Sequence, residues 1–421
     1  MRRLTTPVTD LQAGVRAVLD QRLKHESAAP ITVGLSGGGD SHALTLFAAD
    51  WARRHGRRLI VLTVDHQLRP ESRGWTRACA ALAARLGLEF HALDWMGDKP
   101  AHGLSAAARS ARHRLLAVAA RDLGARVILL GHTASDLDEA AAMRLEGSTT
   151  PSPREWSPSP VWPEGRDLFL LRPMLALARA EIRDWLTAQG ETWIEDPSNS
   201  DLRFARARAR ARARAAGPTP SSSLGAEPSD GLADLARAVR ADPAGVLTLP
   251  RAALAAPDGA KLVAIASLCA AGTDRPPRGE RLERLALALR GPLPVTATLC
   301  GARIEADAHE VRFAREAGEI KRANLPTLDL MGEGVWDGRF EVRASRPVRI
   351  AALAGHSARL PAAEREALRH IPRAARGALP ILVSSNGEVT CPILEPASDV
   401  TVRSLVLARL MAACGAIPAE P

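Results

Sequence analysis

The chain has 421 residues, of which 46% are hydrophobic and 24% charged, a balance typical of a globular protein with roughly two or three domains. It has no uncharged apolar run of membrane-spanning length, and charged residues interrupt the region behind the N-terminus. The sequence therefore predicts a cytoplasmic protein, neither membrane-spanning nor secreted. The formal net charge of +9 is compatible with an anionic partner such as nucleic acid, although arginine is abundant throughout the chain.

Short apolar runs predict β-strands in the first half of the chain, and helix-length segments separate them. The expected strands are Ile31–Leu35, Arg58–Asp65, Glu89–Asp94 and Arg126–Gly131, and the expected helices are His42–His55, Ser72–Leu86 and Ser105–Leu123. The runs are β-branched or leucine-rich, which is typical of strands covered on both faces. This alternation predicts an α/β, Rossmann-like fold, in which a parallel sheet carries helices on both faces and the site lies beyond the C-terminal strand ends.

Composition changes in the region that follows. Pro and Ser are frequent in Ser148–Glu164, which predicts a long exposed loop, and Gly217–Asp230 is typical of a linker. Further helices are expected at Gly231–Ala241 and Ala260–Gly272, and strand pairs at Arg303–Arg315 and Gly338–Ile350. We expect a nucleotide-binding catalytic domain at 1–216, a smaller, mostly helical domain at 217–330 and a small α+β domain at 331–421.

The first predicted strand leads directly into a glycine-rich loop with the sequence Ser-Gly-Gly-Gly-Asp-Ser. Glycines let the backbone approach an oxyanion closely, and their amides, with a helix N-terminus behind them, suit a polyphosphate. Asp40 would repel phosphate unless a cation lies between, so it predicts a Mg²⁺ ion. A glycine turn capped by Asp40 is the alternative, but the preceding buried strand favours phosphate binding. We assign the pyrophosphate to Ser36, Gly37, Gly38, Gly39, Asp40 and Ser41.

The loop resembles the signature of the PP-loop ATP pyrophosphatase superfamily, whose members cleave ATP between the α and β phosphates and form adenylated intermediates. Later segments are similar to one of its families, the tRNA(Ile)-lysidine synthases. These segments are Val64–Ser72, Ala108–His113, Gly131–Ala140, Leu171–Ile182 and Trp193–Arg210. The last is the most specific because it keeps Asp-Pro-Ser-Asn, although Ala207 stands where the family usually has Asn. The resemblance implies an adenine nucleotide alpha hydrolase-like fold that uses ATP.

Polar residues follow two of the predicted strands. Asp65 and His66 follow one strand and His132 another, so we expect them at one rim of the sheet, beside the nucleotide base and ribose. Asp136 and Glu139 are three residues apart and should share a helical face, where they could hold Mg²⁺ or orient an incoming amine. The alternatives are structural histidines and a solvated helical face.

Arginines provide the candidate anion-binding groups. Arg109 and Arg112 are three residues apart on a predicted helix and suit a phosphate, unless they serve only the solubility of its surface. Arginines alternate with alanine in Arg206–Arg214, which suits an RNA backbone, with a basic low-complexity segment as the alternative. We assign Arg112 and Arg206 to the α phosphate or to the tRNA.

The family resemblance implies a ligase that adenylates C2 of the wobble cytidine of tRNA(Ile) with the anticodon CAU and then attaches free L-lysine, giving lysidine. It implies ATP and Mg²⁺ as cofactors and leaves a homodimer open. A 2-thiolating enzyme of the same superfamily is an alternative, but it would usually need paired cysteines, and the five cysteines here are scattered. A non-catalytic tRNA-binding protein is the other alternative, and the intact Asp40 argues against it.

Overall fold

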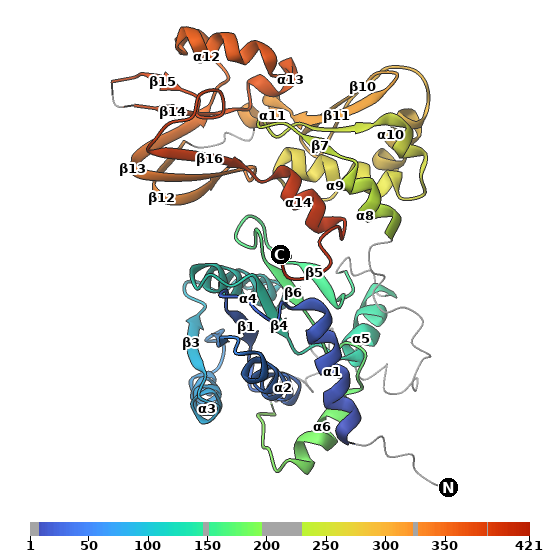
Figure 1. Ribbon diagram of the computed structural model, residues 1–421, viewed down its shortest axis with the longest axis vertical. Helices are drawn as coiled ribbons and strands as arrows, with labels where there is room; N and C mark the ends of the chain where they lie inside the picture. The colour runs from blue at the N-terminus through green and yellow to red at the C-terminus, as the bar shows by residue number, and fades with distance from the viewer. Residues whose placement is uncertain (1–7, 146–150, 196–229, 323–326, 385) are drawn as a thin grey trace. The chain divides into compact units, whose positions relative to one another are not determined.

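The computed structural model describes residues 8–145, 151–195, 230–322, 327–384 and 386–421 (Figure 1). The chain divides into two compact units: the first comprises Met1–Glu227 together with Ile417–Pro421, and the second comprises Pro228–Ala416. The domain boundary predicted near 216 lies outside the described residues. The boundary predicted near 330 falls inside a strand of the second unit and stays a prediction. Every helix in the described ranges is too short or too polar to span a lipid bilayer.

The first unit contains a six-stranded sheet with the order β3-β2-β1-β4-β6-β5. Its strands are β1 (Ile31–Gly34), β2 (Leu59–Asp65), β3 (Glu89–Asp94), β4 (Val127–Leu130), β5 (Trp156–Pro158) and β6 (Phe169–Leu171). All neighbours pair in parallel except β5, which runs antiparallel along β6. The predicted parallel sheet is therefore confirmed, and one antiparallel edge strand is added.

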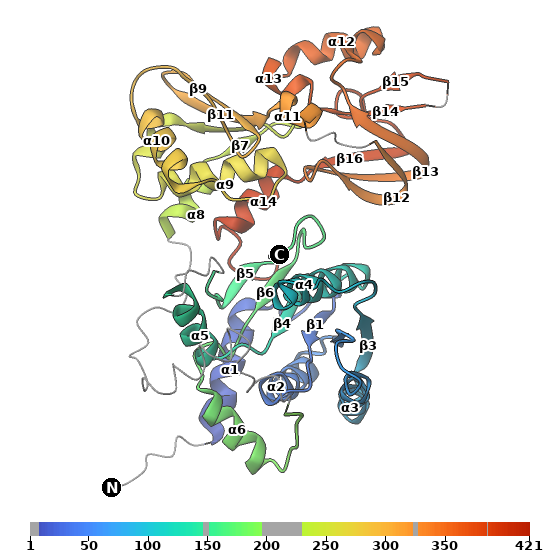
Figure 2. The ribbon, with the colours of Figure 1, turned by 180° about the vertical axis from the view of Figure 1, so that it is seen from behind.

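Helices cover both faces of this sheet, as predicted (Figure 2). Their bounds are α1 (Val8–Arg22), α2 (Gly39–His55), α3 (Ser72–Arg85), α4 (Leu104–Asp122), α5 (Ala134–Leu145) and α6 (Arg179–Ala188). On one face, Leu116 and Ala120 of α4 pack with Ile60, Leu62 and Ile128 of the sheet. Helix α2 lies on the opposite face, where Phe47 and Trp51 are buried. The core thus holds the strand ends in place on both sides.

Two local predictions for the first unit were wrong. Strand β3 was expected to be covered on both faces, but it lies at the sheet edge, where Glu89 is exposed and pairs with Arg58. Ser148–Glu164 was expected to be an exposed loop, but it contributes β5, whose Trp156 is buried and stacks on Phe169. Both differences depend on sheet position, which the local composition does not encode.

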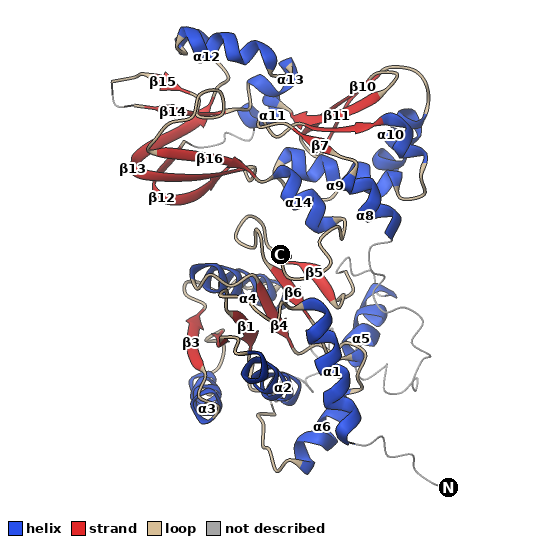
Figure 3. Cartoon of the chain, viewed as in Figure 1, coloured by secondary structure: helices blue, strands red, loops and turns tan. Residues whose placement is uncertain are grey.

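The second unit contains two antiparallel sheets (Figure 3). The first sheet has the order β7-β8-β11-β10-β9, and the second joins β12, β13, β14 and β15, with β16 on the other side of β13. The strands are β7 (Arg240–Ala241), β8 (Leu247–Pro250), β9 (Val295–Leu299), β10 (Ala302–Ala306), β11 (Glu310–Arg315), β12 (Leu328–Trp336), β13 (Phe340–Ala352), β14 (Pro380–Val383), β15 (Val389–Thr390) and β16 (Val400–Ser404).

Helices pack against both of these sheets. The helices are α8 (Asp230–Arg237), α9 (Gly259–Ala271), α10 (Gly279–Arg290), α11 (Ala317–Arg322), α12 (Ala362–Ala367), α13 (Arg373–Arg376) and α14 (Val406–Ala413), with 3₁₀ turns η2 (Arg251–Ala255), η3 (Ser357–Arg359) and η4 (Leu368–His370). Leu410 of α14 packs in one core with Leu262 of α9 and Phe313 of β11. The domain at 217–330 was predicted to be mostly helical, but its described residues combine helices with a whole sheet. The strand pair predicted at Arg303–Arg315 is confirmed as β10 and β11, and the helix expected at Gly231–Ala241 ends at Arg237.

The segment Ile417–Pro421 belongs to the first unit, although it follows the second along the chain. The Glu420 carboxylate accepts hydrogen bonds from Arg57 across 2.9 and 3.1 Å, and these two side chains are 2% and 1% exposed. Trp156 Nε1 donates to the Ile417 carbonyl across 2.7 Å. Arg57 and Trp156 thus anchor the C-terminal segment to the first unit.

Candidate active site

The glycine loop connects β1 to α2 and is supported from behind by the segment that follows α6. Gly37 has a φ of +86°, in the left-handed region that favours glycine. A Cβ on Gly37 would lie 2.5 Å from Ile194, and one on Gly39 would lie 3.3 Å from the Trp193 indole. The Ile194 amide donates to the Gly37 carbonyl across 2.9 Å. Packing and backbone geometry therefore both require glycine at Gly37, and this support fixes the shape of the loop.

The backbone amides of the loop are available to an anion. Within the described ranges, no residue accepts a hydrogen bond from the amides of Gly37, Gly38 or Gly39. The Ser41 hydroxyl donates to the Gly38 carbonyl across 2.9 Å and accepts from the Ser36 amide across 3.1 Å, and the pyrophosphate role assigned to Ser41 stays a prediction. Ser41 thus braces the loop in this structure, and the three glycine amides beside the N-terminus of α2 fit a phosphate group.

The end of β4 lies directly against the start of α2. A Cβ on Gly131 would be 3.0 Å from the backbone of Asp40 and of Ser41, so a side chain here would force the two backbones apart by a few tenths of an ångström. The close approach brings helix α5, which begins three residues later, alongside the glycine loop. The two segments that carry the predicted carboxylates are therefore neighbours, although they are distant in sequence.

Asp40, Asp136 and Glu139 converge on one guanidinium, and we call these three residues the acidic triad. Arg179 Nε donates to Asp40 Oδ2 across 2.8 Å and Nη2 to Asp136 Oδ2 across 3.3 Å. Arg179 Nη1 lies 3.5 Å from Glu139 Oε1. The Asp136 and Glu139 residues are buried, so the alternative of a solvated helical face is wrong. Their predicted position on a shared face of α5 is confirmed.

The electrostatics of the triad suit a bound cation. Burial raises the pKa of Asp40, and the charge of Arg179 opposes this rise. Burial lowers the pKa of Arg179, but the three carboxylates more than offset this effect and leave the pKa raised. Carboxylate oxygens are the ligands that Mg²⁺ prefers, and Asp40 directly follows the last glycine of the loop. The residues present therefore fit a divalent cation at Asp40.

Asp136 also has a structural task at the start of α5. Its Oδ2 atom accepts hydrogen bonds from the Thr133 amide across 2.9 Å and from the Thr133 hydroxyl across 3.2 Å. This carboxylate thereby satisfies an amide at the N-terminus of the helix. Because the same oxygen also faces Arg179, the helix start holds the carboxylate in a fixed place within the triad.

The polar residues at the strand ends have individual partners. Asp65 is buried and accepts a hydrogen bond from the Gln67 amide across 2.7 Å, which shapes the turn after β2. His66 meets the Trp95 ring edge-on, and burial, aided by the Arg112 charge, lowers the pKa of His66. The Nδ1 atom of His132 accepts from Arg172, so its position is fixed by the protein. None of these contacts requires a nucleotide, and the roles predicted for the three residues stay predictions.

Guanidinium groups from α4 and from the residue after β6 place positive charge around His113. Burial, with the charges of Arg112, Arg109 and Arg172, lowers the pKa of His113 to about 2. Burial and neighbouring arginines also lower the pKa of Arg172 to about 9. Such a field favours an anion, in keeping with the phosphate role predicted for Arg112. Arg206 and the alternating arginine run lie outside the described residues.

Sequence reasoning missed Arg179 as a site residue. Its signal was present, because it directly precedes Ala180-Glu181-Ile182 in a segment already matched to the family. Reasoning from the sequence also gave no role to Trp193 and Ile194, whose contacts with the glycine loop only the fold reveals. Arg179, Trp193 and Ile194 all contact residues that lie far away along the chain, and the sequence alone does not show these contacts.

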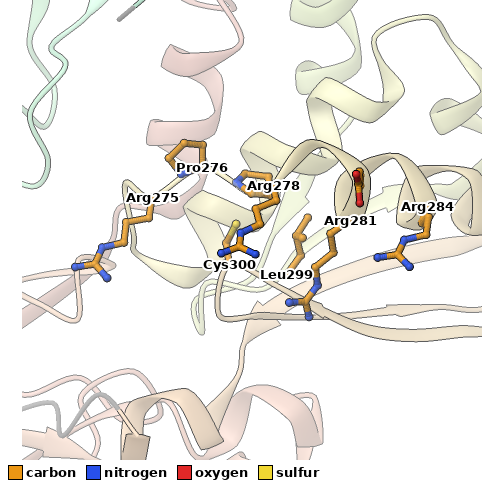
Figure 4. A pocket seen from close by; sticks show the side chains of 9 residues that line it. Arg275, Pro276, Arg278, Arg281, Arg284, Leu299 and Cys300 are labelled. Atoms are coloured by element: carbon orange, nitrogen blue, oxygen red, sulfur yellow. The ribbon is translucent and has the colours of Figure 1, made fainter. Parts of the chain in front are cut away.

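An arginine-lined cavity of about 470 Å³ lies in the second unit, and we call it the arginine cavity (Figure 4). It is lined by Arg275, Pro276, Pro277, Arg278, Glu280, Arg281, Arg284, Leu299 and Cys300. Among the described residues, no carboxylate forms an ion pair with any of its four arginines, whereas Arg312, Arg343 and Arg349 elsewhere in the unit do have such partners. The cavity is therefore a candidate phosphate-binding surface.

A second cavity, of about 480 Å³, adjoins the turn after β2 and is lined by Gln67, Leu68, Arg69, Pro70, Ser72 and Arg73.

Comparisons with known proteins agree with these features. A PP-loop domain family matches residues 11–215. The curated tRNA(Ile)-lysidine synthase of Caulobacter vibrioides is 50% identical over 415 residues, which span 96% of this chain and 98% of that protein. That of Hyphomonas neptunium is 36% identical over 69% of this chain and 83% of its own length. Among solved structures, a U34-tRNA thiolase from Methanococcus maripaludis matches with a TM-score of 0.41 and 15% identity, over 49% of this chain and 71% of that one.

Proposed function

The chain belongs to the tRNA(Ile)-lysidine synthase family, as its motifs predicted, and on this premise we propose that it is an ATP-dependent ligase that converts a cytidine of tRNA(Ile) into lysidine. The observation that carries the proposal is the 50% identity over 98% of the Caulobacter vibrioides enzyme. The acidic triad supports it together with the glycine amides, which have no acceptor within the described ranges, because the reaction needs both a polyphosphate site and a site for an amine.

The first step in this proposal activates the wobble cytidine of the CAU anticodon. The O2 oxygen of the base attacks the α phosphorus of ATP, and pyrophosphate leaves. The amides of Gly37, Gly38 and Gly39 hold the departing phosphates, and Arg112 neutralises charge that builds on the α phosphate. Mg²⁺ held by Asp40 would supply further positive charge to the leaving pyrophosphate.

The second step replaces the adenylate with free L-lysine. The ε-amine, in its neutral form, attacks C2 of the base, and AMP leaves with the oxygen that was O2 of cytidine. The attacking nitrogen loses a proton as the new carbon–nitrogen bond forms. We assign Asp136 and Glu139 to orienting this amine, since both carboxylates are buried next to the loop and lie 3.3 and 3.5 Å from nitrogens of the Arg179 guanidinium.

The proposed RNA-binding surface includes the second unit. The arginine cavity offers four guanidiniums to phosphates, which position an RNA without reading its sequence. We further propose that Arg206 contacts the tRNA and that the segments 217–330 and 331–421 hold the tRNA body. A cytoplasmic location and a homodimer remain predictions. No observation favours a 2-thiolating activity or a non-catalytic binding protein.

The proposed function is tested by incubating the protein with ATP, Mg²⁺, radiolabelled lysine and a panel of tRNAs. Label is expected in tRNA(Ile) with the CAU anticodon and in no other tRNA. Equal label in tRNAs with other anticodons would contradict the proposed substrate, and no label in any tRNA would contradict the proposed reaction.

A further inference from the structure

Arg179 directs each of its guanidinium nitrogens toward a different member of the acidic triad. The carboxylates come from two elements, Asp40 from α2 and Asp136 with Glu139 from α5. The Arg179 side chain is only 14% exposed, so water screens these interactions weakly. Three ionised carboxylates and one guanidinium leave this cluster with a formal charge of 3 − 1 = 2 negative units.

The same three carboxylates carry the cation-binding roles in the proposed reaction. A Mg²⁺ ion demands short, nearly octahedral oxygen contacts and strongly repels a neighbouring guanidinium. Arg179 Nε lies 2.8 Å from Asp40 Oδ2, so the guanidinium charge would stand directly beside any metal ion that this carboxylate holds. The guanidinium therefore competes with a metal ion for the triad.

We propose that Arg179 is an exchangeable counter-ion of the acidic triad. Before the nucleotide binds, Arg179 offsets one of the three negative charges. When Mg·ATP binds, Arg179 releases Asp40 to Mg²⁺ and turns toward the phosphates. The inference rests on the proposed function only in assuming that Mg·ATP is the ligand of the glycine loop.

Two features of α6 allow such an exchange. Arg179 is the first residue of the helix, and the Glu181 carboxylate accepts a hydrogen bond from the Ala178 amide across 3.1 Å, so the helix start is held without the guanidinium. A guanidinium also suits phosphate as well as carboxylate, because its planar fork donates to two oxygens of either group. The side chain can thus change partners while the backbone of α6 stays in place.

Direct metal binding tests the exchange. Mn²⁺ affinity is measured by electron paramagnetic resonance on the full chain without ATP, tRNA or lysine, in wild type and in Arg179→Gln. Removing the competing cation is expected to tighten Mn²⁺ binding by on the order of tenfold. Unchanged or weaker binding would overturn the proposal, because a residue that merely positions Asp40 would weaken metal binding when it is lost.

Arg183→Gln is the matched control. Arg183 lies one turn further along α6 and pairs with Glu195 across 3.0 Å; among the described residues it forms no ion pair with the triad, and its charge acts on Asp40 only as a minor influence from a distance. This variant removes the same charge and is expected to change Mn²⁺ affinity by less than about twofold. Equal tightening in both variants would show that net charge alone sets the affinity, and would overturn the exchange.

Thermal unfolding supplies a second readout that does not depend on lysidine formation. Arg179→Gln is expected to unfold at a lower temperature than wild type in EDTA and to regain most of the difference in Mg²⁺, while Arg179→Lys stays closer to wild type. If Mg²⁺ does not restore the unfolding temperature of Arg179→Gln, Arg179 has a purely structural role and the proposal is overturned. If Arg179→Gln binds Mn²⁺ more tightly but the wild type transfers no lysine to tRNA, the exchange is supported and only the proposed function is contradicted.

Discussion

Arg172 Nε donates to Nδ1 of His132 across 3.1 Å and thereby joins the end of β6 to the end of β4. Because Nδ1 accepts this bond, the proton of the neutral ring resides on Nε2. The contact ties two neighbouring strands at the rim where the acidic triad begins. The rim is thus a prearranged surface, and its individual parts can be tested by substitution.

Asp40→Asn should abolish lysine transfer. The amide keeps the shape of the carboxylate but loses the charge that would hold Mg²⁺, and a loss of at least about a hundredfold in rate is expected. ATP–pyrophosphate exchange in the presence of tRNA measures the first step alone. Binding of tRNA, followed on filters, should persist, and a variant with nearly wild-type exchange would contradict the metal role of Asp40.

Gly131→Ala should destabilise the first unit by roughly 1–3 kcal/mol, because the new methyl group would overlap the backbone of Asp40 and Ser41. Urea unfolding measures the change in free energy. Gly14→Ala is the control, since a Cβ there has no neighbour within 4 Å and alanine favours the helix interior. Equal stability of Gly131→Ala and wild type would mean that β4 and α2 separate easily.

His113 should make stability fall as the solution becomes acidic. Its pKa of about 2 in the folded protein lies far below the ordinary 6.5, so below pH 6.5 the unfolded chain binds a proton that the folded chain excludes. This difference in proton binding lowers the free energy of unfolding by about 1.4 kcal/mol at pH 5.5 and by almost nothing at pH 7.5. His113→Phe should remove this pH dependence in urea titrations, whereas the exposed His102→Gln should keep it. A His113→Phe protein with the wild-type pH dependence would contradict the burial of a neutral ring.

The arginine cavity should contribute to tRNA affinity through phosphate contacts. The double variant Arg278→Ser and Arg284→Ser is expected to bind tRNA more weakly and to lower the slope of log affinity against log salt by about one to two units. Arg349→Ser, which removes an exposed arginine already paired with Asp329, is the control. Filter binding at several KCl concentrations checks the result, and an unchanged slope would place the RNA elsewhere.

Glu420→Gln should destabilise the first unit by about 3–5 kcal/mol, since it leaves the buried Arg57 guanidinium with an uncompensated charge. Urea unfolding at pH 7 provides the measurement. Glu388→Gln changes an exposed side chain and should have little effect. A small loss in Glu420→Gln would show that Arg57 finds other partners, such as the Ala29 carbonyl that it already contacts.

Local sequence patterns were sufficient to predict the strands, the glycine loop and the shared helical face of Asp136 and Glu139. Strand and helix periodicity depend on neighbouring residues, so these features can be recognised from short segments. Arg179 escaped prediction because its partner Asp40 lies 139 residues away, so only the assembled sheet brings them together. Strand β5 escaped for a related reason: Trp156 hydrogen-bonds to Ile417, 261 residues further along, and no property of the Pro-rich segment reveals that contact.

The placement of Ile417–Pro421 has a mechanical consequence. Val8 and Pro421, the first and last described residues, both belong to the first unit, so a pulling force applied to them loads that unit while the second lies outside the load path. The second unit bears tension only after Ile417–Pro421 has lost its contacts with the first unit, among them the Arg57–Glu420 pair and the Trp156–Ile417 hydrogen bond. In an optical trap, the first rupture should therefore release the C-terminal segment, and extension of residues 228–416 should follow it.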